Sequence, residues 1–465
     1  MAKQSVLGVP SGTQRPRFVA VWMSAALGGV MLLQLPGASQ EGKSPSQILR
    51  ERRASQRLRE RAEAARKAEQ AKKTVVRTPR PSQPRPNPAV SAQRLAEQRA
   101  AANRRARERR QQAQERQARL ARANPGAVVV SRDLDWRSAQ AGGAIRVDVG
   151  GKQYGVTLPA GALDELKVTA PNLIPAAAGG QKRDLLVTLN VTAGKGDQWR
   201  NPVDDAGLRF VPEGLAPVGP DNNLLDSLGA VLKDWPSSWL EQLRRDITAG
   251  SAAPARDAGG YWMYETEVTV AQFERYCKAA NQTLPPQPGT ADTSAPVVNV
   301  PFVAAKQYCV WLQERLEKEH QIQCEVVLPA IADWQYAALG GAAGGLFVWG
   351  NGLPGGKAGN LPDQKAGEMH PDWEVIESYS DGYAGLAPVR TSSENGFSLF
   401  DLAGNAAEWC VDRAAKPATR GGSWRNQPLA DFLIFAPPAP DDGEARDDVG
   451  FRPIVRNLRA AAEKK

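Results

Sequence analysis

The sequence predicts an α+β protein of three unlike parts: a helical basic arm, a small β-rich middle domain and a larger C-terminal body. Charge is segregated, since residues 41–124 carry 24 Lys and Arg against 8 Glu, whereas residues 125–465 have a net charge of −10. Short alternating segments typical of strands follow the arm. Beyond them, Gly and Trp recur around two helix-like stretches, which is typical of a loop-rich domain supported by bulky side chains.

A chain of 465 residues is long enough for several domains. The overall net charge of +9 describes neither the arm nor the body, so the parts are considered separately. We expect five segments: 1–40, a signal peptide or membrane anchor; 41–124, the basic arm rich in Ala, Arg, Gln and Glu, with a Pro-rich break at 79–88; 125–255, the middle domain, ending in helices; 256–457, the body; and 458–465, a tail.

The N-terminal region contains an uncharged stretch at 18–35, preceded by Arg15 and Arg17. It fits either a signal peptide, with small residues near 37–39 for cleavage, or a membrane anchor. We therefore expect a membrane contact through 18–35 and a membrane-anchored or exported protein of a bacterial cell envelope. Basic residues also follow the stretch, so the positive-inside rule leaves the orientation open.

Two stretches of the arm, 46–76 and 89–123, are rich in strong helix formers, and Glu115 stands four residues before Arg119. The segment TPRPSQPRPNP separates them and breaks any helix. Large apolar residues are too few for a self-sufficient coiled coil. Two interpretations stay open: residues 41–124 contact an anionic lipid surface or nucleic acid, or they form a solvated, partly helical linker.

The middle segment changes to a strand-like pattern. AIRVDVGGKQYGVTLP alternates around a Gly-Gly turn and predicts a β-hairpin, and DLLVTLNVTAG predicts a further strand. Residues 222–247 then become helical in pattern, with Ser238 and Glu241 spaced as a capping box. No catalytic constellation is visible in this segment.

The composition excludes several kinds of site. The four cysteines, Cys277, Cys309, Cys324 and Cys410, are too few for a disulfide framework and have no C-x-x-C spacing. The chain has only two histidines, which lie far apart in sequence, so a metal site built on several imidazoles is not expected. No stretch matches a phosphate-binding GxxxxGK[ST] loop.

The body carries a series of motifs: YWMYETEVT at 261–269 followed by AQFERYC, PVVNVPFVAAKQYCVWL at 296–312, LPAIADWQYAALGG at 328–341, FVWGN at 347–351, ENGFSLFDLAGNAAEWCVD at 394–412, RGGSW at 420–424 and GFR at 450–452. In this order and at this spacing they resemble the formylglycine-generating enzyme (sulfatase-modifying factor) family. The resemblance implies a C-type-lectin-like α+β fold with little regular structure. The stretches VAQFERYCKAA and VAAKQYCVWLQERLEKE predict the two helices.

The resemblance also implies structural calcium. Short Gly-containing loops let side-chain and backbone oxygens converge on this ion. The first set implied is Asn360, Leu361, Asp381 and Tyr383, and the second is Asp401, Leu402, Gly404, Ala406 and Glu408. Asn360, Asp381, Asp401 and Glu408 would bind through side chains and the others through carbonyls. The alternative is that these polar residues only cap turns and bond local backbone.

The family's oxidases use two Cys between the GGSW-like and GFR-like motifs to bind copper(I) and oxidise a substrate Cys to formylglycine. Here the intervening stretch, RNQPLADFLIFAPPAPDDGEARDDV, contains no Cys. Cys309 and Cys410 lie in motifs where small buried residues are expected. We therefore expect no copper and assign no catalytic residue.

The leading functional hypothesis is a non-catalytic binding or scaffold module on a membrane-anchored or exported chain. Its loops at 353–390 and 425–447 would recognise a protein or glycan partner, because loops on a rigid support carry most recognition. One alternative is an oxidase of the same type with an altered active site. The other is a nucleic-acid-binding protein that uses the basic arm.

Overall fold

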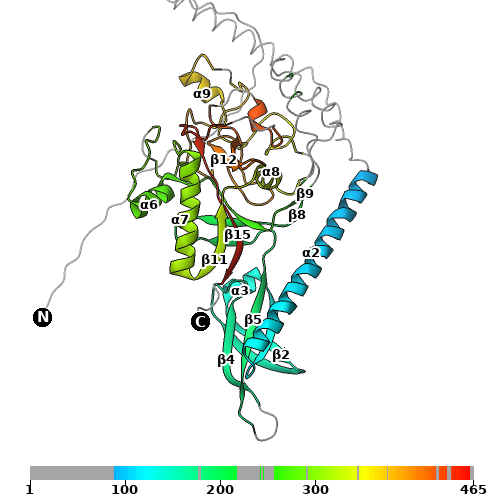
Figure 1. The fold of residues 1–465 in the computed structure, drawn as a ribbon. Coiled ribbons are helices and arrows are strands. Elements are labelled where there is room, and N and C mark those ends of the chain that lie inside the picture. Colours follow the sequence, from blue (N-terminus) through cyan, green and yellow to red (C-terminus); the bar gives the residue numbers. More distant parts are fainter. Residues whose placement is uncertain are drawn as a thin grey trace, which may run out of the picture. The chain divides into compact units, whose positions relative to one another are not determined.

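The computed structural model describes residues 88–460 except 176–179, 217–240, 242–244, 246–255, 290–291, 343–344, 374, 426–428 and 437–440 (Figure 1). The expected anchor at 18–35, the first arm helix at 46–76 and nearly all of the helical pattern at 222–247 lie outside the described residues. Among the helices that the structure does describe, none is both long and apolar enough to span a bilayer.

The second stretch of the arm forms α2, Pro88–Ala123, one helix of 36 residues. It contacts β1 and β8, and Ala101 on it is buried. Arg116 Nη2 lies 2.8 Å from Glu165, and both Arg105 and Arg109 pair with Glu213. This helix therefore lies against folded structure, although partly exposed ion pairs of this kind stabilise by only about 0–1 kcal/mol each.

The middle segment contains two small sheets. β1 (Val128–Asp135), β4 (Lys167–Ile174) and β5 (Arg183–Thr192) form one sheet in the order β1-β5-β4, with β1 parallel to β5. β2 (Gly143–Val149) and β3 (Lys152–Leu158) form the predicted antiparallel hairpin, and DLLVTLNVT forms β5 as predicted. The hairpin turn places Gly150 and Gly151 at φ of 59° and 84°, which glycine adopts without a steric cost.

A five-stranded sheet crosses the expected boundary at 255/256. Its order is β11-β15-β10-β7-β6, made by Ile322–Val327, Ile454–Ala460, Tyr261–Tyr264, Gly207–Val211 and Gln198–Arg200. β7 pairs with β10 along its length, from Tyr261 with Val211 to Tyr264 with Leu208. The strands β6 and β7 therefore belong to the sheet of the C-terminal body, although they precede it by some 50 residues in the chain.

The two predicted helices of the body are α6, Val270–Ala280, and α7, Phe302–His320. α6 begins with a capping box in which Thr269 and Gln272 exchange side-chain and backbone hydrogen bonds. The remaining elements are short: α3 (Trp136–Ala141), β8 (Gly214–Ala216), β9 (Arg256–Ala258), α8 (Ile331–Leu339), α9 (Gln364–Met369), β12 (Ala407–Val411), β13 (Pro417–Arg420), the 3-10 helix η1 (Leu429–Phe432) and β14 (Val449–Gly450). The described chain is thus a mixed arrangement of helices and sheets.

A buried carboxylate between β6 and β7 connects these strands to β10 and to α7 of the body. Asp204 accepts hydrogen bonds from the hydroxyls of Tyr264 and Tyr308, both at 2.6 Å. Burial raises the pKa of Asp204, and the two hydroxyl donors act in the opposite direction. The network therefore depends on both tyrosines.

We expect Tyr308→Phe to lower the free energy of unfolding by about 1–3 kcal/mol, because it removes one donor from a buried carboxylate. Urea denaturation of the full chain would measure this change. Tyr154→Phe is the control, since Tyr154 is a partly exposed residue of the hairpin and its substitution should cost little. Equal costs for the two variants would contradict the importance of the Asp204 network.

Candidate functional site

The structure brings the first implied calcium set together. Leu361 N donates to Asp381 Oδ2 and Tyr383 N donates to Asp381 Oδ1, both at 2.9 Å. Asn360 lies beside this turn and is buried, with its Nδ2 donating to Gly385 O at 2.8 Å. All four implied residues therefore lie in one small region where two loops meet.

One oxygen of this region has no hydrogen-bond partner among the described residues. Asn360 Oδ1 is buried and accepts no hydrogen bond from the described residues, whereas Asn360 Nδ2 also donates to Asn405 Oδ1 at 3.0 Å. A buried acceptor without a donor is unfavourable, and a cation would satisfy it. The set of an amide oxygen, a carboxylate and neighbouring carbonyls fits a hard cation such as calcium.

A second carboxylate, missed in the sequence, adjoins the first set. Asp363 is fully buried and accepts from Asp381 N at 2.6 Å and Ala366 N at 2.9 Å. Burial, together with the nearby charge of Asp363, raises the pKa of Asp381 to about 6. The position of Asp363 two residues after Leu361 was the available signal, since short calcium loops often hold several carboxylates.

Both carboxylates of the second implied set accept a hydrogen bond on each oxygen. Asp401 Oδ1 accepts from Ser392 N at 2.8 Å, and its other oxygen accepts from Arg390 N. Glu408 Oε2 accepts from Trp334 Nε1 at 2.7 Å, and Glu408 Oε1 accepts from Arg452 Nη2 at 2.6 Å. For Asp401, as for Asp381 in the first set, the structure therefore shows the local backbone bonding that was the alternative to a metal role.

The backbone members of the second set run beside the first set. Leu402, Gly404 and Ala406 are on the segment that leads into β12, and Gly404 forms a bridge with Asn360. Gly404 has a φ of 78°, and a Cβ there would lie 2.0 Å from Asn360 O. A glycine is thus required at this position because the two implied sets touch each other.

Glu267 is the residue that sequence reasoning missed in the second set. Its side chain is fully buried, and neither carboxylate oxygen has a hydrogen-bond partner among the described residues. Arg452 Nη2 is 3.7 Å away, and Asp401 and Glu408 add negative charge. Burial, followed by the charge of Asp401, raises the pKa of Glu267 well above its usual range. Its place in the ETEVT motif was the signal.

Within the described ranges, no three or more His, Cys, Asp or Glu side chains converge at metal-binding spacing. Arg452 supplies the positive charge at the second set, because its guanidinium lies between Glu408 and Glu267. Neither carboxylate oxygen of Glu267 has a hydrogen-bond partner among the described residues, and its raised pKa reflects how poorly its charged form is compensated there. The residues present therefore fit one further cation, which would bind first of all to the carboxylate of Glu267.

Comparison with known proteins identifies the domain that holds both sets. Residues 236–458 match the model of the family described as "Sulfatase-modifying factor enzyme 1-like domain". The C-terminal part of the chain is such a domain.

Several proteins are similar to this domain. A formylglycine-generating enzyme of Thermomonospora curvata is 33% identical over 147 residues, which cover 29% of this chain and 43% of the relative. The "Inactive C-alpha-formylglycine-generating enzyme 2" of Bos taurus is 33% identical over 135 residues, covering 28% of this chain and 38% of the relative. The chain thus spans less than half the length of these curated relatives. The solved structure of PvdO from Pseudomonas aeruginosa aligns with 57% of this chain and 100% of its own at 18% identity, with a TM-score of 0.40.

The cysteines of the sulfatase-modifying factor enzyme 1-like domain lie within packed structure. Cys277, Cys309 and Cys410 are buried and Cys324 is partly buried, and none forms a disulfide. Burial raises the pKa of Cys324 to about 12 and raises that of Cys410 well above the usual range. At neutral pH these two thiols are therefore protonated, whereas copper(I) binding and nucleophilic attack need a thiolate.

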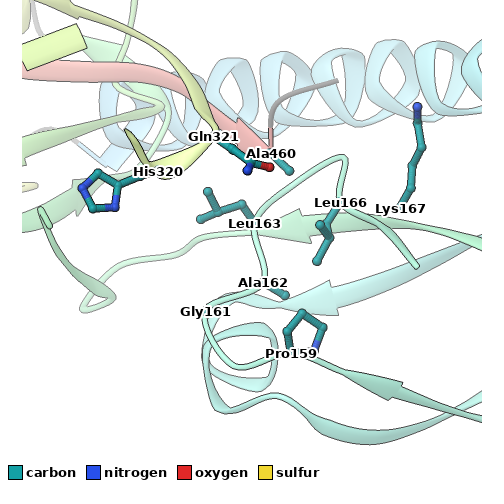
Figure 2. Close-up of a pocket in the computed structure, with 9 residues that line it drawn as sticks. All are labelled: Pro159, Gly161, Ala162, Leu163, Leu166, Lys167, His320, Gln321 and Ala460. Atoms are coloured by element: carbon teal, nitrogen blue, oxygen red, sulfur yellow. The ribbon is translucent and has the colours of Figure 1, made fainter. Parts of the chain in front are cut away.

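A cavity of about 310 Å³ lies away from the implied calcium residues. The β3–β4 connection lines one side through Leu163 and Leu166, and the ends of α7 and β15 line the other through His320, Gln321 and Ala460 (Figure 2). Figure 2 shows Lys167 extending away from the other lining side chains. The polar groups therefore do not converge on one point, and no residue of the two implied sets contributes to the cavity.

Proposed function

We propose that the chain is a non-catalytic binding or scaffold protein, membrane-anchored or exported, whose sulfatase-modifying factor enzyme 1-like domain has a C-type-lectin-like arrangement. One observation carries the proposal: the stretch between Trp424 and Gly450, where the oxidases of the resembled family hold two Cys, contains none. The buried and protonated thiols of the domain offer no substitute. The similarity to a relative named as an inactive formylglycine-generating enzyme supports the same proposal.

The full chain is expected to leave a Cys-containing sulfatase peptide unoxidised in the presence of copper and oxygen. Peptide mass spectrometry would measure the conversion, because formylglycine formation changes the mass of the cysteine residue. A formylglycine-generating enzyme assayed in parallel is the positive control. Copper-dependent conversion by this chain would overturn the proposal and favour the oxidase with an altered active site.

Structural calcium belongs to the same proposal. The first ion would be held by Asn360, Leu361, Asp381 and Tyr383, and the second by Asp401, Leu402, Gly404, Ala406 and Glu408 together with Glu267. The unpartnered oxygens of Asn360 and Glu267 support both assignments. Calcium would neutralise buried carboxylates and fix the loops that carry recognition.

A second candidate function is a contact between α2 and an anionic lipid surface or nucleic acid. Arg107, Arg110 and Arg122 are exposed on this helix, whereas Arg105 and Arg116 are directed to Glu213 and Glu165. The exposed arginines are thus available for phosphate groups.

Triple replacement of Arg107, Arg110 and Arg122 by Gln should weaken binding to phosphatidylserine vesicles or to duplex DNA at low salt, and reduce its dependence on salt. Co-sedimentation would measure binding to the vesicles, and fluorescence anisotropy would measure binding to the DNA. The measurement uses the full chain. Arg105→Gln is the single-site control, because it removes an arginine of α2 that is paired with Glu213. Absence of binding to either probe at low salt would exclude this function for α2.

A further inference from the structure

The two loop regions expected to carry recognition meet at a cluster of aromatic rings. His370 stacks on Trp373 with ring centroids 4.1 Å apart and an interplanar angle of 11°. Trp424 lies 5.5 Å from Trp373 and 6.1 Å from His370. Arg425 lies over the Trp424 ring at 4.8 Å and forms a forked pair with Asp447. We call these five residues the aromatic cluster.

The aromatic cluster has an exposed part and a buried part. His370 and Trp373 are half-buried, and Arg425 and Asp447 keep 37% and 43% of their side chains exposed. Trp424 retains only 7% exposure. A ligand would therefore reach the His370 and Trp373 rings and the Arg425–Asp447 pair from solvent, and it would reach the buried Trp424 Nε1 and Arg425 Nε once the side chains above them move aside.

Two buried N–H donors of the cluster have no acceptor among the described residues. One is Trp424 Nε1 and the other is Arg425 Nε. Arg425 uses its other two nitrogens on Asp447, at 2.7 and 3.0 Å. A buried donor left without an acceptor is unfavourable, so two such donors beside partly exposed rings indicate a place where acceptor oxygens bind.

The negative charge around the cluster disfavours an anionic ligand. Residues 441–448 contain five acids, Asp441, Asp442, Glu444, Asp447 and Asp448, against one arginine. Two of these acids are already bound by arginines, Asp441 by Arg446 and Asp447 by Arg425, yet the segment remains net negative. Nucleic acid and acidic lipid would therefore be repelled.

The unpartnered donors in turn disfavour a cationic ligand. An ammonium or guanidinium group has donors only, so it cannot accept from Trp424 Nε1 or Arg425 Nε. A neutral ligand rich in hydroxyl groups can do so, because each hydroxyl both donates and accepts. Asp447 can accept from such hydroxyls while Trp424 and Arg425 donate to others.

We propose that the aromatic cluster binds a neutral carbohydrate. The apolar C–H face of a pyranose ring would pack on Trp373 and His370, and the sugar oxygens would accept from Trp424 Nε1 and Arg425 Nε. The ring faces supply contact area at a low entropic cost, and the polar groups set the orientation. This inference rests on the proposed binding function and assigns that function a ligand class and a site.

The test uses the full chain on an array of neutral oligosaccharides built from hexoses and N-acetylhexosamines, with sialylated and sulfated glycans on the same array. We expect binding to a subset of the neutral glycans and none to the anionic ones. Isothermal titration with the best neutral oligosaccharide then gives the dissociation constant. Binding confined to anionic glycans, or no glycan binding at millimolar concentration, overturns the inference.

Trp373→Ala should weaken the binding at least tenfold, and Asp447→Asn should weaken it several-fold. Trp311→Ala is the matched control: Trp311 is a half-buried tryptophan on α7 that also has an unpartnered indole N–H, but it packs on Tyr276 and Tyr308 in a separate group of rings. It should leave the affinity unchanged. Thermal melts of each variant separate loss of binding from loss of folding.

The outcomes also separate this inference from the proposed function. Glycan binding that Trp373→Ala leaves intact would place the ligand elsewhere and overturn the assignment to the aromatic cluster. Capture of a proline-rich peptide library by the cluster, with no glycan bound, would replace the carbohydrate by a peptide and keep the binding function. Oxidation of the sulfatase peptide would overturn the proposed non-catalytic binding function, and the separate peptide assay would detect it.

Discussion

Replacing Arg452 by methionine is expected to lower the free energy of unfolding by about 3–5 kcal/mol, because it breaks a fully buried ion pair from one side. Its Nε and Nη2 donate to Glu408 Oε1 at 2.9 and 2.6 Å. Its other bonds reach Tyr264 O at 3.1 Å and Phe400 O at 2.8 Å. Without the guanidinium, the carboxylates of Glu267 and Glu408 would lose their internal cation.

Equilibrium denaturation of the full chain would measure the effect of Arg452→Met. The control is Arg459→Met on β15, the strand that begins two residues after Arg452, because Arg459 is 44% exposed and lies 3.5 Å from Glu165. A partly exposed pair of this kind should contribute at most about 1 kcal/mol. Similar costs for the two variants would show that the buried guanidinium does not hold the carboxylates of the domain together.

A double variant refines this expectation. Adding Glu408→Gln to Arg452→Met removes the second charge of the pair, so the double variant should be more stable than the sum of the two single costs predicts. The rescue should be incomplete, because the buried carboxyl group of Glu267 would also have lost the neighbouring guanidinium. Strict additivity would mean that the two side chains do not interact in the folded state.

Elements defined by local pattern were predictable from the sequence. The hairpin of β2 and β3 follows from alternation around Gly150 and Gly151, and α6 and α7 follow from their apolar spacing. Each of these depends on residues close in the chain. The T-x-x-Q spacing at Thr269 was an equally local signal for the start of α6 and was not used.

Features created by long-range contact were not predictable in the same way. Nothing in the GLRFV segment of β7 shows that it pairs with β10, because many strands carry the same alternation. The same holds for the charge balance around Glu408, which depends on Arg452 and Glu267 from distant motifs. Motif spacing indicated which residues belong together. It did not show that an arginine would take part of the role given to an ion.

Chelation of calcium is expected to destabilise the full chain, and Glu267 is expected to decide how much. Calcium at 100 times its dissociation constant would add about 2.7 kcal/mol to the free energy of unfolding if it binds only the folded state. Glu267 is the residue most in need of that ion, because both of its carboxylate oxygens are buried without a hydrogen-bond partner among the described residues. Thermal unfolding in calcium and in EDTA would measure the difference.

Glu267→Gln should have opposite effects in the two conditions. In EDTA it should be more stable than the parent chain, since the raised pKa of Glu267 means that its buried carboxyl group takes up a proton on folding at neutral pH, a cost that Gln does not have. In calcium it should be less stable than the parent, since the ion loses a charged ligand. The calcium-dependent shift should therefore shrink or disappear in this variant.

The control for Glu267→Gln is Glu265→Gln, two residues earlier. Glu265 is also buried, but it is already paired with Arg209 at 2.7 Å and with Arg390. Its replacement should destabilise the chain equally in calcium and in EDTA, because no ion is needed there. If the parent chain melts at the same temperature in both conditions, Glu267 keeps a proton rather than a calcium ion, and Arg452 alone balances this part of the domain.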